Sequence, residues 1–214
     1  MTAVPLAMHG QLSNRMRILP IRIIILLLVC FPARAVAVEI LRVAVISDMN
    51  GSYGSTRYEA TVDSAVARIL ELKPDLVLST GDMVAGQRIP HLARNAVLPM
   101  WDAFHEHVSA PLANASIPLA VTPGNHDASA YAGFGLERTV FAEQWTPRKP
   151  DVRFVDDAGY PFHYAFEFAD ILFISLDATT VGHLPQQQMD WLRQVLAEHG
   201  AASQRRVVFS HVPL

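Results

Sequence analysis

Four short segments of this 214-residue chain carry side chains that bind metal ions, and each follows a run of apolar residues. They are Asp48-Met49-Asn50, Gly81-Asp82, Gly124-Asn125-His126-Asp127 and Ser210-His211. Carboxylate and amide oxygens together with imidazole nitrogens suit divalent ions such as Mn, Fe, Zn or Ni. Two ions about 3.5–4 Å apart can hold both the attacking and the leaving oxygen of a phosphoryl transfer, and one ion lowers the pKa of bound water to about 7. The pattern favours metal-dependent phosphoryl chemistry.

The apolar runs before these segments are predicted to be β-strands. They span residues 41–47, 76–80, 117–122 and 206–210. In open α/β sheets, binding sites form beyond the carboxyl ends of the strands, so polar residues that are distant in the sequence would meet there. Glycines beside these residues would allow tight backbone turns.

Amphipathic stretches alternate with the strands, which is typical of an α/β domain. The predicted helices cover residues 57–72, 91–108, 136–145 and 186–199. Pro99 would kink or divide the second of them. Residues 164–168 and 171–176 face each other across Ala169-Asp170, which predicts a β-hairpin.

The four polar segments, in this order and each after a strand, resemble the calcineurin-like metallophosphoesterase superfamily. The resemblance covers essentially all of the chain after residue 37. It extends to Leu176-Asp177 and to residues 188–192, which are similar to the bacterial cyclic-nucleotide phosphodiesterase and purple acid phosphatase branches. It implies a four-layer αββα sandwich with a dinuclear metal site, and hydrolysis of phosphomonoesters or phosphodiesters by metal-activated hydroxide.

The resemblance also implies a role for each candidate residue. Asp48 would ligate the first metal, and Asp82 would bridge the two metals. Asn125 and His211 would ligate the second metal. His126 would lie near the leaving group, either as a proton donor or as a charge that stabilises the transition state.

Three departures from the family pattern qualify these expectations. Asn50 stands where the first motif usually has histidine, and an amide oxygen is a weaker ligand, so the chain would hold two ions (Mn, Fe or Zn) or only one. The Asp-Arg-Gly that follows Gly-Asp in Ser/Thr protein phosphatases is absent after Asp82, which disfavours that branch. The family's final Gly-His-x-His is not reached before Leu214, so the carboxyl-terminal part of the fold is expected to be missing. The alternative hypothesis is therefore a truncated, non-catalytic remnant that binds one metal or none.

The amino-terminal residues 1–37 are predicted to be a signal peptide, followed by the phosphoesterase domain over residues 38–214. The apolar run 23–31 is nine residues long, which fits a secretory core of about 7–15 residues and not a membrane span of about 20. Arginines precede the run, and Ala35 and Ala37 provide a small-residue cleavage site. The chain is expected to be exported to the periplasm or secreted, and an uncleaved membrane anchor is the alternative.

Composition excludes several other classes of function. The chain is 51% hydrophobic and 17% charged, unlike disordered or coiled-coil proteins. Residues 1–37 contain four arginines and no acidic residue, so the net charge of −3 becomes −7 without them, which disfavours nucleic acid as a partner. The only cysteine, Cys30, would leave with the signal peptide, which excludes thiolate chemistry.

A small phosphoester is the expected substrate. Its specificity would be set by the loops at residues 51–57, 86–91, 128–162 and 178–185, and the oligomeric state is left open.

Overall fold

Residues 40–213 are described by the computed structural model, and they contain two β-sheets. The first sheet is parallel, in the order β1-β2-β3, with β1 at Val43–Ile46, β2 at Leu76–Ser79 and β3 at Leu119–Val121. The second sheet is mixed and has the order β4-β5-β6-β7. Its strands are β4 (Arg153–Asp156), β5 (Tyr164–Phe168), β6 (Ile171–Ser175) and β7 (Arg205–Phe209), of which only β6 and β7 pair in parallel.

The inner strands of the two sheets, β2, β5 and β6, bury residues on both faces, since alternate residues of a strand point to opposite sides. In β2, Val77 faces a layer of helices, while Leu76 and Leu78 face the second sheet. In the second sheet, Phe166 and Phe173 pack back against Leu76 and Leu78. The runs of apolar residues in these short strands therefore reflect burial on two sides.

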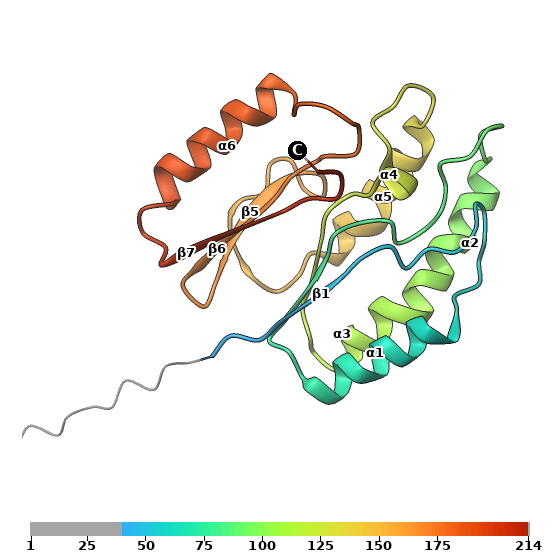
Figure 1. The fold of residues 1–214 in the computed structure, drawn as a ribbon, viewed down its shortest axis with the longest axis horizontal. Coiled ribbons are helices and arrows are strands. Elements are labelled where there is room, and N and C mark those ends of the chain that lie inside the picture. Colours follow the sequence, from blue (N-terminus) through green and yellow to red (C-terminus); the bar gives the residue numbers. More distant parts are fainter. Residues whose placement is uncertain (1–39, 214) are drawn as a thin grey trace, which may run out of the picture. The chain divides into compact units, whose positions relative to one another are not determined.

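Helices cover the outer face of each sheet (Figure 1). The layer on the first sheet consists of α1 (Ala60–Leu72), α2 (Arg94–Phe104), the π-helical turn η1 (His105–Ser109), α3 (Ala110–Asn114) and α5 (Gly135–Trp145), which is followed by the 3₁₀ turn η2 (Thr146–Arg148). On the second sheet, α6 (Gln186–His199) packs Val195 against Leu172 and Ile174. The order helix, sheet, sheet, helix confirms the predicted αββα sandwich.

The predicted strands, the hairpin and the helix at residues 186–199 are confirmed, but Pro99 does not divide the second predicted helix. The helix predicted over residues 91–108 begins at Arg94 and continues through Pro99; its hydrogen bonding changes only at η1. Met100, Trp101 and Phe104 on the turns around Pro99 are fully buried, and their packing outweighs the one hydrogen bond that Pro99 cannot donate. The short helix α4 (Asn125–Ala128) and the strand β4 were not predicted.

The predicted signal peptide at residues 1–37 lies outside the described residues. Among residues 40–213, no helix is both long enough and apolar enough to cross a membrane.

Candidate metal centre

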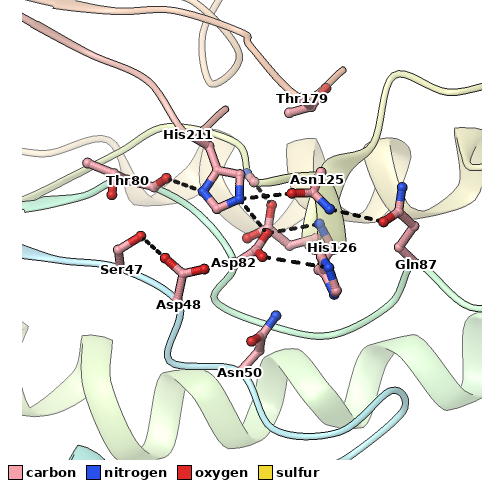
Figure 2. A network of polar contacts seen from close by, with 12 residues as sticks. Ser47, Asp48, Asn50, Thr80, Asp82, Gln87, Asn125, His126, Thr179 and His211 are labelled. Carbon is pink, nitrogen blue, oxygen red and sulfur yellow. Dashed lines mark hydrogen bonds and ion pairs between the residues drawn. The ribbon is translucent and has the colours of Figure 1, made fainter. Parts of the chain in front are cut away.

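Both sheets deliver polar residues to one place, just beyond the carboxyl ends of their strands (Figure 2). Asp48 follows β1 and Asp82 follows β2 of the first sheet. Asn125 and His126 open α4, directly after β3. His211 follows β7 and so comes from the second sheet. The convergence predicted from the sequence is therefore found, and two sheets contribute to it.

Three of these residues form a group whose chemistry fits a divalent metal ion. Asp48, Asp82 and His211 each offer one ligand atom, and these atoms lie within 4.8 Å of one another. Two carboxylates and one imidazole form the mixed oxygen and nitrogen set that Mn, Fe and Zn accept. Asp82 is 4% exposed, whereas Asp48 is exposed to solvent, so the group has one open side.

A sharp turn of the backbone presents both carboxylates. Asp48 has φ 52° and Asp82 has φ 54°, the left-handed region that Asp tolerates better than most residues. The two turns are tied together, because Asp48 N donates to Gly81 O at 3.2 Å and Asn50 N donates to Asp82 O at 3.1 Å. Each strand thus ends in the same way, with its Asp turned toward the common centre.

Two glycines make the close approach of these loops possible. A Cβ atom on Gly124 would lie 2.1 Å from the backbone nitrogen of Asp82 and 2.3 Å from its Oδ1. Gly81 has φ 102°, and a Cβ there would lie 2.6 Å from the backbone of Gly124. No side chain fits in either place, so the Gly-Asp and Gly-Asn-His-Asp segments require glycine for steric reasons.

Asp127 joins the loop after β2 to the loop after β3. It is 1% exposed and accepts hydrogen bonds from Gly124 N at 2.7 Å and Met83 N at 2.8 Å. Burial, and then the negative charge of Asp82, raise the pKa of Asp127 to about 7, against the lowering effect of those two hydrogen bonds. Asp127 therefore holds the two loops in place.

His211 follows β7 of the second sheet, and its ring contacts residues that follow strands of the first sheet. Its Nδ1 donates to Thr80 O at 2.9 Å, and its Nε2 lies 2.9 Å from Asn125 Oδ1 and 3.3 Å from Asp82 Oδ1. Burial lowers the pKa of His211, but the hydrogen bond and charge of Asp82 and the bond to Thr80 outweigh it and raise the pKa to about 9. The Thr80 carbonyl also directs Nε2 toward the centre, which is how backbone acceptors orient ligating histidines.

His126 is held on two sides. Its backbone N–H donates to Asp82 Oδ1 at 2.9 Å, and its Nε2 lies 3.9 Å from Asp82 Oδ2. The ring stacks on Tyr53 from the loop after β1, with centroids 5.0 Å apart and 5° between the planes. The position of the imidazole beside Asp82 is compatible with the role expected of His126, which is to donate a proton to the leaving group or to stabilise the charge of the transition state.

The two asparagines are anchored differently. Asn125 Nδ2 donates to Gln87 Oε1 at 3.0 Å, which leaves its Oδ1 toward His211. Asn50 Nδ2 lies 3.5 Å from Val84 O, at the outer limit for a hydrogen bond. Asn125 is thus firmly oriented, whereas the carboxamide of Asn50 is held weakly.

All six residues predicted from the sequence lie around one centre (Figure 2), and their individual roles stay predictions. Sequence reasoning did not identify the contributions of Gln87, Thr80 and Asp127, or the stacking of Tyr53 on His126. Gln87 and Tyr53 lie in loops that carry no motif of their own, and Thr80 acts through its backbone, so no pattern of residue types could have found them.

Comparison with known proteins shows the family of the chain and a similar fold. A family model described as calcineurin-like phosphoesterase matches residues 41–214. Among solved structures, a dimetal phosphatase from Danio rerio is similar, with a TM-score of 0.54 and 19% sequence identity over 81% of this chain and 70% of that one. At this identity the likeness concerns the fold alone. A search of curated proteins found no match.

Proposed function

The chain belongs to the calcineurin-like phosphoesterase family and is a metal-dependent phosphohydrolase, and we propose that it cleaves small phosphomonoesters or phosphodiesters after export. The observation that carries the proposal is the convergence of Asp48, Asp82 and His211 within 4.8 Å, where strands of both sheets end. Asp48 is exposed, so the ligand group is accessible from solvent on that side.

We propose two divalent ions, Mn, Fe or Zn, at this centre. Asp48 and Asn50 would hold the first ion, Asp82 would lie between the two, and Asn125 and His211 would hold the second. Ions bound there would polarise the phosphoryl oxygens and lower the pKa of water, which supplies the nucleophile. The oxygen-rich donor set supports this proposal, and the weakly held Asn50 makes the first position the weaker one.

His126 is proposed to supply a proton to the leaving group. Its Nε2 is the ring nitrogen on the Asp82 side, and from there a proton would pass to the leaving oxygen as the phosphorus–oxygen bond breaks. Asp82 Oδ1 accepts from the His126 backbone N–H, and Tyr53 covers one face of the ring, so the imidazole is oriented before substrate binds.

Hydrolysis of chromogenic phosphates tests this function. We expect Mn²⁺-dependent release of nitrophenol from p-nitrophenyl phosphate or its bis-ester, and loss of this release in Asp82→Ala. Asp190→Ala, which removes an exposed carboxylate on α6, is the matched control and should keep full activity. Equal turnover in the wild type and Asp82→Ala, or turnover unaffected by chelation, would contradict the proposal.

Metal analysis of the purified protein tests the number of ions. Close to two ions per chain supports the dinuclear centre. One ion or none, together with absent turnover, would favour the non-catalytic alternative that Asn50 suggests. Asp190→Ala should carry the same metal content as the wild type.

Export is proposed from residues 1–37 alone. The nine-residue apolar run, the arginines before it and the Ala35 and Ala37 pair support cleavage after Ala37. Amino-terminal sequencing of the protein from fractionated cells should begin at Val38, in the periplasm or medium. An intact amino terminus in the membrane fraction would favour the uncleaved anchor instead.

A small substrate is proposed on the basis of charge. Without residues 1–37 the chain has a net charge of −7, and binding of nucleic acid depends on basic residues that neutralise phosphates. Competition by a short oligonucleotide against p-nitrophenyl phosphate should therefore be weak; strong inhibition at low salt would contradict this part of the proposal.

A further inference from the structure

A carboxamide ligand has two ends of nearly equal size, and only one of them can bind a cation. The oxygen of Asn125 has lone pairs, whereas its NH₂ group presents hydrogens and would repel an ion. Which end faces the centre therefore depends on the hydrogen-bond partners of both ends. In this structure Asn125 Oδ1 lies 2.9 Å from His211 Nε2, on the side of Asp82.

Within residues 40–213, the opposite end of Asn125 has one well-formed partner. Asn125 Nδ2 donates to Gln87 Oε1 at 3.0 Å (Figure 2). Gln87 is itself held, because its Nε2 donates to Ser129 Oγ at 3.1 Å and its backbone N–H donates to His126 O at 3.1 Å. Ser129 is 1% exposed and also accepts from Tyr131 N at 3.2 Å. The acceptor offered to Asn125 thus belongs to a side chain with little freedom to turn.

We propose that Gln87 is a positioning residue that fixes the orientation of the Asn125 carboxamide so that its oxygen faces the metal. The inference rests on the proposed function, in which Asn125 is a ligand. Gln87 contacts neither metal nor substrate in this role. It acts by binding the NH₂ end of Asn125, so that a rotation of the carboxamide by half a turn would break a hydrogen bond and place hydrogens at the ion.

A double-mutant cycle on Mn²⁺ binding, measured by calorimetry with the metal alone, tests this role. Gln87→Met removes the acceptor with little change of volume and should weaken Mn²⁺ binding about tenfold, as is usual for residues that orient metal ligands. In Asn125→Asp the two carboxylate oxygens are equivalent and no orientation has to be chosen. There, adding Gln87→Met should change the Kd by less than about threefold.

The cycle separates positioning from general damage. A loss of packing at position 87 would weaken binding equally in both backgrounds, and that result would overturn the inference. Gln87→Glu keeps an acceptor for Asn125 Nδ2 and should bind Mn²⁺ at least as tightly as the wild type; weakening equal to that of Gln87→Met would also overturn it. Gln194→Met, on the exposed face of α6, is the matched control and should leave the Kd unchanged.

The same measurements distinguish this inference from the proposed function. If Asn125→Ala binds Mn²⁺ as tightly as the wild type, or the wild type binds none, the ligand assignment fails and the role of Gln87 fails with it. If Asn125→Ala weakens binding and Gln87→Met does not, the ligand assignment stands and the inference about Gln87 alone is wrong.

Discussion

The Tyr53 ring lies flat on the His126 imidazole, with ring centroids 5.0 Å apart and 5° between the planes. Tyr53 comes from the loop after β1 and is 50% exposed, whereas His126 belongs to α4 after β3. The stack joins two of the loops that surround the candidate metal centre. Because Tyr53 covers one face of the imidazole, the ring can shift only toward its opposite face.

Replacing Tyr53 should therefore affect turnover more than substrate binding. Stacked aromatic pairs contribute about 0.5–1.5 kcal/mol, which corresponds to at most about tenfold in rate. We expect Tyr53→Ala to lower kcat for p-nitrophenyl phosphate by about three- to tenfold, with a smaller change in KM. Tyr53→Phe keeps the ring and should retain kcat near the wild-type value. A fall of equal size in both variants would show that the hydroxyl group is what matters.

Gly124→Ala should disrupt the centre through steric conflict. The added Cβ would lie 2.1 Å from Asp82 N, so the two loops would have to separate. We expect a loss of stability of about 1–3 kcal/mol or more, and loss of Mn²⁺ binding. Gly135→Ala is the matched control, because a Cβ there meets nothing within 4 Å; in helix α5 it should be neutral or stabilise by up to about 1 kcal/mol. Thermal melting and calorimetry measure both, and comparable effects of the two substitutions would contradict the steric explanation.

Acid should destabilise the fold in part through His105. Burial, and then the charge of Arg148, lower the pKa of His105 below its ordinary value of 6.5; the bond to Gln144 and the charge of Asp102 oppose this. As pH falls, the His105 side chain therefore takes up a proton in the unfolded chain at a higher pH than in the native one. The native state is then disfavoured: its full free energy of unfolding is present above pH 6.5, and part of it is lost as pH falls through the lowered pKa of His105.

His105→Gln removes this titration, and its Tm should fall less than that of the wild type between about pH 7 and about pH 5. His183→Gln, in an exposed loop, is the control and should follow the wild-type curve. Parallel curves for the wild type and His105→Gln would contradict the role of His105.

Removing the carboxylate of Glu137 should stabilise the protein. Its side chain is 2% exposed on α5, and neither carboxylate oxygen has a hydrogen-bond partner among residues 40–213. A buried polar group without a hydrogen-bond partner is costly, so Glu137→Met should raise the free energy of unfolding by about 1–3 kcal/mol. Glu143→Met on the same helix removes only an exposed ion pair with Arg94 and should change it by less than about 1 kcal/mol. A lower Tm for Glu137→Met in thermal melting would mean that the carboxylate has a stabilising partner in solution.

The strands and the candidate metal-binding segments could be predicted because their physical causes are local. A buried strand reads as a short apolar run, as at Leu76–Ser79, and an Asp at its end must lie at the edge of the sheet. Gly81 and Gly124 are required by the close approach of two backbones, so the segments that contain them keep a recognisable form.

What could not be predicted depends on contacts between distant segments. The path of α2 through Pro99 is decided by the burial of Trp101 and Phe104, which a local rule for proline does not include. The pairing of Gln87 with Asn125 is similar, because it joins two loops that are adjacent only in the folded chain. Local signals therefore predicted the elements and the convergence of the candidate residues, and tertiary packing decided how their side chains are oriented.

The bond from His211 to Thr80 also bears on the order in which the protein assembles. These two residues are 131 positions apart in the chain, and they meet only when β7 has paired with β6 and the second sheet has packed on the first. During synthesis Asp48 and Asp82 emerge long before His211, so an early intermediate would hold two carboxylates and lack the imidazole. Tight capture of metal would thus follow the packing of the two sheets and would mark a chain in which β7 has already paired with β6.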